Sequence, residues 1–240
     1  MAVTVEKQTQ LRHEVKFEID KLEHQILRRK LSIILKPDPN MRRGPYNVRS
    51  LYFDDCQNSA LYQKEAGIFR RKKYRVRIYN HSDSYIKFEK KAKIGQYMLK
   101  ENIRITRNEA DRLIARNYDF LTETKNELLR DFYVETRCNL MRPVSLVEYE
   151  REAYIHPVGT VRVTFDTGLR TALGCSGLFK ENACMMTARA QKGIILEVKY
   201  NEVLPKFIRG LFPDTIKPKL AIGKFVICRN QQMNQRGRIA

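Results

Sequence analysis

The sequence predicts an α+β protein that is mainly β-structure, because apolar and polar side chains alternate with a period of two along much of its 240 residues. Such alternation is typical of strands that bury one face. Hydrophobic residues make up 42% of the chain, which is enough for a sizeable core. No internal repeat or low-complexity linker divides the sequence. We therefore expect one domain over residues 1–240, with residues 231–240 as a flexible tail.

The period-two pattern recurs from one end of the chain to the other. The expected strands are residues 13–19, 47–53, 72–79, 84–92, 101–106, 145–155, 161–167, 193–200 and 224–229. Asp20 and Glu23 form a plausible capping pair for a helix over residues 20–36, which Pro37 ends. Further helices are expected at residues 106–117, 122–130 and 203–210. Residues 171–192 are rich in small side chains and are expected to form a long loop.

The charge balance is the strongest global feature. The chain has 46 Lys and Arg residues against 27 Asp and Glu, a formal net charge of +19. This excess predicts a polyanionic partner, which can be nucleic acid, an anionic membrane or a phosphate-rich molecule. No apolar run approaches the roughly 20 residues that span a bilayer, and no signal peptide is present, so we expect a cytoplasmic protein. The five cysteines form no C-x-x-C pair, which argues against a disulfide framework or structural zinc.

The run RRKKYRVRIY at residues 70–79 shows how these charges are arranged. In a strand, residues i, i+2 and i+4 share a face. This places Lys73, Arg75 and Arg77 on one side of the strand, and the other side is apolar. Like charges held this close repel one another by roughly 1 kcal/mol per pair even in water. The cationic side therefore needs either bulk solvent or an anion.

Other expected strands also carry charged residues on one face. The shared sets are Glu14 with Lys16; Lys87 with Glu89 and Lys91; Lys100 with Arg104; Tyr149 with Arg151; Arg162 with Thr164 and Asp166; and Glu197 with Lys199. Two geometries explain this pattern. In the first, a sheet exposes one face to solvent. In the second, a barrel encloses its charged side around a polyphosphate and is covered by helices on its apolar side.

The motifs, taken in order, resemble one known family. They are EVK (14–16), RVR (75–77), KFEKK (87–91), Lys100, YER (149–151), VRVTFDT (161–167) and LEVKY (196–200). This set resembles the triphosphate tunnel metalloenzymes, and most closely the polyphosphate-polymerase (VTC) domain family, over residues 12–229. The resemblance implies an antiparallel, tunnel-like barrel of about eight strands with helices packed outside.

The resemblance also implies roles for individual residues. The expected catalytic contacts to phosphate are Arg75, Arg77, Lys91, Arg151 and Lys199. The expected substrate-binding residues are Lys16, Lys87, Lys100, Arg162, Lys224 and Tyr149, of which Tyr149 would contact the nucleotide base. Glu197 resembles the main ligand of Mn²⁺ or Mg²⁺, followed by Glu14. Arg12 occupies the first acidic position of the wider superfamily's E-x-E-x-K motif, which suits a polymerase better than a two-metal hydrolase.

These expectations lead to one main functional hypothesis and two alternatives. The main hypothesis is transfer of the terminal phosphoryl group of ATP to a growing polyphosphate chain. A tripolyphosphatase or nucleoside triphosphatase is the second, with Glu89, Glu148, Glu150 or Asp166 as candidates for positioning water. A non-catalytic binder of polyphosphate or nucleic acid is the third. The main hypothesis requires no stable nucleic-acid partner, and coupling to transport would require a membrane-protein partner.

Overall fold

The computed structural model describes residues 6–8, 12–41, 43–95, 97–172, 174–175, 177–188, 193–212 and 223–236. Within these ranges the chain is α+β and mainly antiparallel β-sheet, as the sequence predicts. None of the helices in these ranges combines the length and the apolar character that a membrane crossing requires.

One antiparallel sheet contains the described strands, in the order β1-β7-β6-β5-β4-β8-β9-β11-β2. Its long strands are β2 (Arg12–Ile19), β4 (Tyr46–Asp54), β5 (Arg70–Tyr79), β6 (Ser82–Ile94), β7 (Tyr97–Ile105), β8 (Arg142–His156), β9 (Val161–Ala172) and β11 (Ile194–Asn201). Three short strands, β1 (Glu6–Gln8), β3 (Lys36–Pro37) and β10 (Met186–Thr187), pair with β7, β8 and β9.

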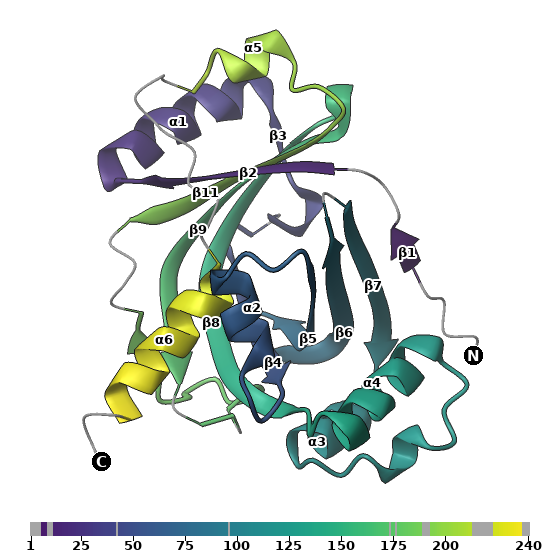
Figure 1. Ribbon diagram of the computed structural model, residues 1–240. Coiled ribbons are helices and arrows are strands. Elements are labelled where there is room, and N and C mark those ends of the chain that lie inside the picture. The colour runs from purple at the N-terminus through teal and green to yellow at the C-terminus, as the bar shows by residue number, and fades with distance from the viewer. Residues whose placement is uncertain are drawn as a thin grey trace.

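The two ends of this sheet curl towards each other. β1 pairs with β7 at one end of the strand order, and β2 lies at the other end. Because Gln8 and Arg12 are four residues apart, their Cα atoms lie within about 15 Å of each other. Figure 1 shows the strands surrounding a common interior. Among the described residues, no hydrogen-bonded ladder joins β7 to β2.

Helices cover the outside of the curved sheet and one side of its interior. They are α1 (Lys21–Ile34), α2 (Ser59–Glu65), α3 (Arg107–Ile114), α4 (Glu127–Cys138), α5 (Lys206–Arg209) and α6 (Lys224–Arg236), with 3₁₀ turns at Pro39–Met41, Asp119–Leu121 and Val158–Thr160. Figure 1 shows α1 and α5 at one end of the molecule, α3 and α4 near the other, and α2 beside α6.

Two apolar cores lie on the outer side of the sheet. One core joins the outer face of β4–β8 to α3 and α4, and another joins β2, β8, β9 and β11 to α1 and α5. On β5, the apolar residues Tyr74, Val76 and Ile78 are at most 1% exposed. Tyr74 packs against Phe132 of α4 with ring centroids 5.2 Å apart. The predicted alternation on this strand is therefore confirmed, and Lys73, Arg75 and Arg77 lie on the concave side, whereas Lys72 pairs with Glu135 of α4 on the outer side.

The helix starts follow local capping rules. The Asp20 side chain accepts a hydrogen bond from the Glu23 amide at 2.8 Å, and the Glu23 carboxylate accepts one from the Asp20 amide at 2.9 Å. This confirms the capping pair predicted for α1. α4 begins at Glu127, later than expected, because the Asn126 side chain caps it by accepting from the Leu128 amide at 3.0 Å.

The prediction for the C-terminal segment is wrong. Residues 224–229, expected as a strand, form the start of α6, and the expected tail from residue 231 is helical as far as Arg236. Phe225, Cys228 and Gln232 are buried at a spacing of three to four residues, which is a helical period. A short apolar run is ambiguous because it fits either period. Residues 237–240 lie outside the described residues.

The loop expected at residues 171–192 is also shorter than predicted. β9 continues through Ala172, and Met186–Thr187 returns to pair with it as β10. Positions 173, 176 and 189–192 lie outside the described residues. Gly177 and Lys180 belong to the segment between β9 and β10. The buried Arg49 side chain of β4 donates to the carbonyl of Gly177 at 2.8 Å and also contacts the carbonyl of Lys180. The segment is thus held against the outer face of β4.

Replacing Gln232 with Ala tests the corrected C-terminal helix. The buried Gln232 amide donates to the Thr171 hydroxyl at 2.9 Å and to the Ala172 carbonyl at 2.5 Å. Leaving these acceptors unsatisfied should lower the free energy of unfolding by about 1–3 kcal/mol, measured by urea denaturation. Asn234→Ala, on the exposed side of the same helix, is the matched control and should change little. Equal stability of the two variants would contradict a docked helix.

Candidate functional site

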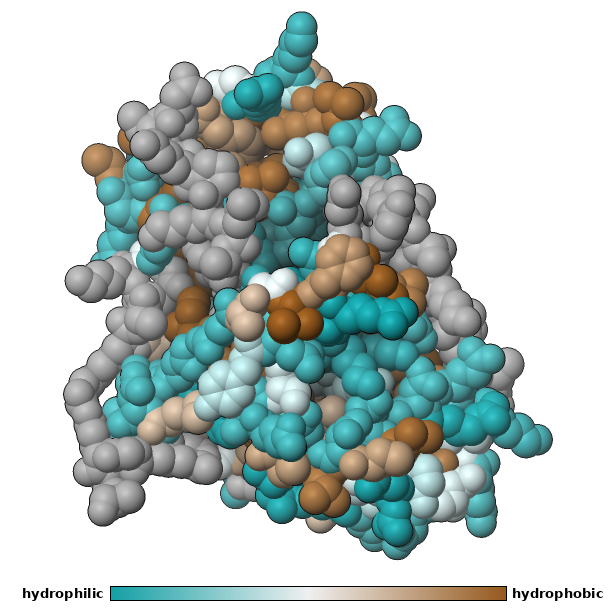
Figure 2. Space-filling model, viewed as in Figure 1, coloured by the Kyte–Doolittle hydropathy of each residue, from teal (hydrophilic) through white to brown (hydrophobic). Residues whose placement is uncertain are grey.

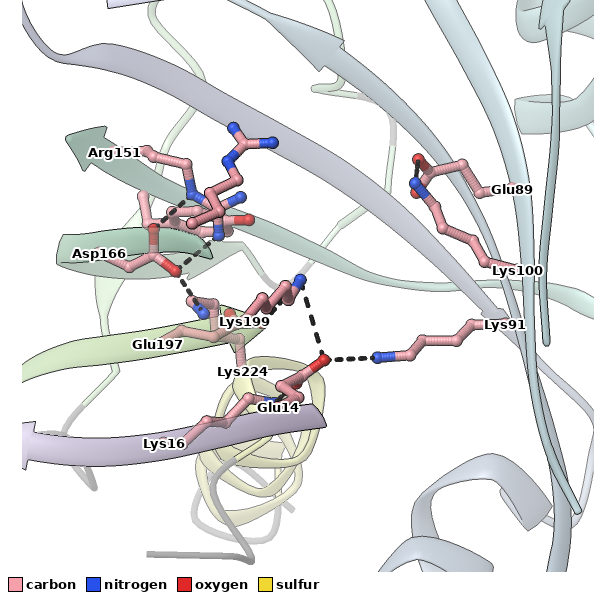
Figure 3. Close-up of polar contacts among 12 residues, drawn as sticks. Glu14, Lys16, Glu89, Lys91, Lys100, Arg151, Asp166, Glu197, Lys199 and Lys224 are labelled. Carbon is pink, nitrogen blue, oxygen red and sulfur yellow. Dashed lines mark hydrogen bonds and ion pairs between the residues drawn. The ribbon is translucent and has the colours of Figure 1, made fainter. Parts of the chain in front are cut away.

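The concave face of the sheet collects charged side chains from several strands (Figure 3). Arg75 on β5 contacts Glu89 Oε2 through its Nε at 2.5 Å and donates to the Tyr52 hydroxyl at 2.8 Å. Lys100 on β7 lies with its Nζ 3.1 Å from Glu89 Oε1. Burial alone raises the pKa of Glu89, but the surrounding cations hold it well below its usual range. Glu89 therefore stays ionised between two cationic strands.

Arg77 is buried on the same face without such a partner. Its side chain donates to the Ser50 hydroxyl at 3.1 Å and to the Tyr149 hydroxyl at 3.4 Å, and the residue is 8% exposed. In the described part of the chain, no carboxylate lies within ion-pair distance of this guanidinium. The charge of Glu89 acts on Arg77 from beyond contact distance, but a buried cation whose direct contacts are neutral hydroxyl groups is costly. A phosphate oxygen at this position would provide the missing negative charge.

A second charged cluster lies on β8 and β9. Arg151 makes a bidentate pair with Asp166, with its Nε 2.6 Å from Oδ1 and its Nη2 2.7 Å from Oδ2. Lys224 Nζ lies 2.6 Å from Asp166 Oδ2. Lys224 is the first residue of α6, so this helix delivers a cation to the concave face. Although burial raises the pKa of Asp166, these two cations lower it overall.

Tyr149 lies between the two clusters. It is 3% exposed, and the Arg151 guanidinium and the Lys224 ammonium lie 5.2 Å and 4.9 Å from its ring centroid. Its hydroxyl accepts from Arg77. The nucleobase contact expected for Tyr149 stays a prediction, but these surroundings do not favour it, because the side chain is almost fully buried.

The two expected metal ligands lie on neighbouring strands. Glu14 on β2 contacts Lys16 at 2.6 Å, and Glu197 on β11 contacts Lys199 at 2.8 Å. Lys199 also lies 3.8 Å from Glu14. Burial raises the pKa of each carboxyl, yet the nearby lysines keep the pKa of Glu14 low and that of Glu197 well below its usual range. Both groups are therefore carboxylates at neutral pH.

Lys91 links the opposite walls of the sheet. It lies on β6, several strands away from β2 in the sheet order, yet its Nζ is 3.3 Å from Glu14 Oε2. This contact spans the interior, as Figure 3 shows. The clusters around Arg75, Arg151 and Lys199 therefore lie on the same concave side of the sheet. Of the two geometries open from the sequence, the structure has the one with the charges inside.

The remaining expected residues lie on the same face, towards one end of the strands. Lys87 on β6 has its Nζ 5.0 Å from the Tyr85 ring centroid. Arg162 on β9 contacts Asp38 at 3.0 Å and donates to the Tyr46 hydroxyl at 3.2 Å.

Sequence reasoning did not select the neutral residues and the counter-ion that organise these cations. Ser50 and Tyr52 hold Arg77 and Arg75, and Asp38 balances Arg162. Ser50 and Tyr52 share a strand face by parity, so the alternation over residues 47–53 contained that signal. Asp38 follows the expected end of a helix, and no periodic pattern marks it.

Glu89 and Asp166, considered above for positioning water, are both ion-paired to cations. Glu148 lies on the other side of the sheet, where it pairs with Arg49 and contacts His81 at 2.9 Å.

The affinity of the site for polyphosphate should fall as the pH rises through about 8. Burial, followed by the charges of Arg75 and Arg77, lowers the pKa of Lys100 to about 8 despite the opposite effect of Glu89. Below this pH Lys100 is a cation that attracts phosphate, and above it the amine is neutral. Because a bound anion favours the charged form, binding near pH 8 should take up a proton.

Titration calorimetry with inorganic tripolyphosphate at pH 7 and pH 9, in buffers of different ionisation enthalpy, measures both effects. Lys100→Arg should lose the part of the pH dependence that Lys100 contributes, because a guanidinium stays charged. Identical pH profiles for this variant and the wild type would show that Lys100 does not titrate in this range.

Comparisons with known proteins agree with this geometry. The VTC domain family model matches residues 11–231. No curated protein sequence matches the chain. A candidate adenylyl cyclase from Hippeastrum, described as having a dominant triphosphatase activity, superposes with a TM-score of 0.55 at 14% identity, covering 90% of this chain and 94% of that one.

Two further structures are less similar. A candidate adenylate cyclase from Bacillus halodurans has a TM-score of 0.49 at 11% identity, with 86% and 87% of the two chains covered. An inorganic triphosphatase has a TM-score of 0.32 at 11% identity, with 90% and 96% covered. At 14% identity, the likeness to the Hippeastrum protein shows a shared fold. With the family match over nearly the whole sequence, the chain belongs to the VTC domain family, within the triphosphate tunnel metalloenzyme fold.

Proposed function

We propose that this protein is a polyphosphate polymerase that transfers the terminal phosphoryl group of ATP to a growing polyphosphate chain. The observation that carries the proposal is the buried guanidinium of Arg77. It lies on the concave side of the sheet beside Arg75, with no carboxylate in ion-pair contact among the described residues. An anion inside the sheet satisfies this group, and membership of the VTC family indicates that the anion is a triphosphate or polyphosphate.

The cations suit phosphoryl transfer because this reaction needs positioning and charge neutralisation more than a covalent nucleophile. Arg75 and Arg77 contact phosphate oxygens from β5, and Arg151 and Lys199 contact them from β8 and β11. Lys91 reaches across between the walls, as its contact with Glu14 supports. The proposed binding residues Lys16, Lys87, Lys100, Arg162 and Lys224 extend this cationic lining along the strands.

A divalent cation, Mn²⁺ or Mg²⁺, fits the site only together with its substrate. Among the described residues, no group of three or more His, Cys, Asp or Glu side chains forms a complete metal site. Glu14 and Glu197 offer two ionised carboxylates on adjacent strands. Two carboxylates plus substrate phosphates are a usual set of ligands for Mg²⁺. When bound there, the metal would neutralise charge on the phosphate oxygens.

The state of the carboxylates supports polyphosphate over water as the acceptor. Glu89 is buried between Arg75 and Lys100, and Asp166 is held by Arg151 and Lys224. A carboxylate so engaged, with a lowered pKa, is a weak general base. An ionised terminal phosphate needs no base to attack. Hydrolysis remains the alternative that product analysis distinguishes.

The arrangement of charges also bears on nucleic-acid binding. Arg75, Arg77 and Arg151 lie on the concave face, where Arg77 is 8% exposed. A nucleic-acid duplex binds to an open, solvated basic surface, whereas a thin oligophosphate fits along the concave side of the curved sheet. We therefore propose ATP and polyphosphate as partners and no stable complex with nucleic acid. We also propose a cytoplasmic location, with a separate membrane protein required for any coupling to transport.

Product analysis with ATP and Mn²⁺ tests the proposal. The wild type should produce long polyphosphate, visible on a polyacrylamide gel, in amounts that match ADP release. Arg75→Ala should lower kcat/KM about 10²- to 10³-fold, the usual effect of removing one transition-state donor. Glu197→Gln should raise the Mn²⁺ concentration needed for half-maximal rate. Orthophosphate as the sole product would establish hydrolysis.

Arg130→Ala serves as the matched control for loss of one positive charge. Arg130 is exposed on α4, on the outside of the sheet, and its guanidinium contacts only the Lys125 carbonyl among the hydrogen bonds described. The Arg130→Ala variant should have the same activity as the wild type. Equal losses in Arg130→Ala and Arg75→Ala would mean that net charge matters and the enclosed site does not.

A further inference from the structure

A row of tyrosines lies at one end of the concave face. Tyr46 begins β4, Tyr79 ends β5, and Tyr85 lies near the start of β6. Their ring centroids are 6.1 Å apart between Tyr46 and Tyr79, and 6.5 Å apart between Tyr79 and Tyr85. The Tyr79 and Tyr85 rings are nearly parallel, at an interplanar angle of 25°. We call Tyr46, Tyr79 and Tyr85 the tyrosine row.

Cations flank the tyrosine row on both sides. The Arg104 guanidinium lies 5.5 Å from the Tyr85 ring centroid, and Lys87 lies 5.0 Å from it. At the other end of the row, Arg162 donates to the Tyr46 hydroxyl. The row therefore crosses several strands and presents aromatic rings with a planar cation beside them. Tyr85 is 43% exposed, so a ligand can reach it.

We propose that this tyrosine row, and Tyr85 above all, binds the base of the nucleoside triphosphate. The inference rests on the function proposed above and assigns one end of the site to the nucleoside. Aromatic rings and guanidinium groups are the usual platforms on which nucleobases stack. Tyr149 offers no such platform, because its side chain is 3% exposed and a base cannot reach its ring.

The spacing along β5 and β6 fits a nucleotide that lies parallel to these strands, with its base on the tyrosine row and its phosphates towards Arg75. Tyr79 is two residues from Arg77 on β5, and Arg77 is two residues from Arg75. Two residues of a strand span about 7 Å. Lys87 lies opposite Arg77 in the register of β5 with β6, two residues from Tyr85. A base on the tyrosine row thus places its phosphates first at Arg77 and Lys87 and then at Arg75, with Lys91 one step further along, opposite Lys73.

The opposite end of the strands has a different chemistry. There Lys73 lies 4.5 Å from the Phe225 ring centroid, and Lys64 and Arg71 are among its charged neighbours. Lys64 in turn has Lys93 as a charged neighbour. A concentration of lysines suits a chain of phosphates, and the Phe225 ring is 3% exposed, so a base cannot stack on it. In Figure 2, the side that carries α2 and α6 is largely hydrophilic. The two ends therefore favour the base and the polymer, respectively.

Binding of two ligands that differ by the nucleoside tests the proposal. Titration calorimetry with Mg²⁺ compares adenylyl imidodiphosphate with inorganic tripolyphosphate, which has no base. Tyr85→Leu should weaken the nucleotide about 5- to 100-fold, from the usual contribution of stacking to one base, and should change tripolyphosphate affinity less than twofold. Tyr85→Phe keeps the ring and should bind the nucleotide like the wild type.

Tyr62→Leu is the control for loss of an exposed tyrosine, because Tyr62 lies on α2 and is 50% exposed. It should leave both affinities unchanged. Nucleotide binding by Tyr85→Leu at the wild-type affinity overturns the inference while leaving the proposed function intact. Equal weakening of both ligands also overturns it, since Tyr85 would then support the phosphate site. A wild type that binds neither ligand overturns the proposed function and the inference together.

Discussion

The burial of like charge on one face of a curved sheet is the constraint on which this structure depends. Arg75, Arg77 and Arg151 project into the same interior, where water screens their repulsion poorly. Glu89 and Asp166 offset two of them with short ion pairs. Among the described residues, the direct contacts of the Arg77 guanidinium are the hydroxyls of Ser50 and Tyr149. The fold thus keeps a buried cation at a position where the proposed phosphate would supply a negative charge.

The internal carboxylates link stability to binding. Their pKa values are lowered by neighbouring cations, so they remain charged over the physiological range and keep those cations in place. A phosphate chain that enters the interior presents oxygens to the same cations. The preformed ion pairs therefore keep the long side chains oriented before substrate arrives, which lowers the entropic cost of binding.

The elements outside the sheet make this interior possible. β5 and β6 bury apolar residues against α3 and α4 on their outer side, so their inner side is free for charge. α1 and α5 do the same for β2, β9 and β11. α6 instead packs on the inner side, where Phe225 joins an apolar cluster with Tyr52 and Tyr149.

Alternation alone determined which side chains share a face. It separated Arg75 and Arg77 from the apolar residues of β5, and it placed Glu197 with Lys199, because strand parity is a local property of the backbone. The ordered motifs identified the family. Only the tertiary structure decided that the charged faces meet inside, that Lys224 reaches Asp166 from a helix, and that Tyr46, Tyr79 and Tyr85 form one row. These contacts join residues far apart in the chain, and their distances depend on how the sheet curves, which no local pattern encodes.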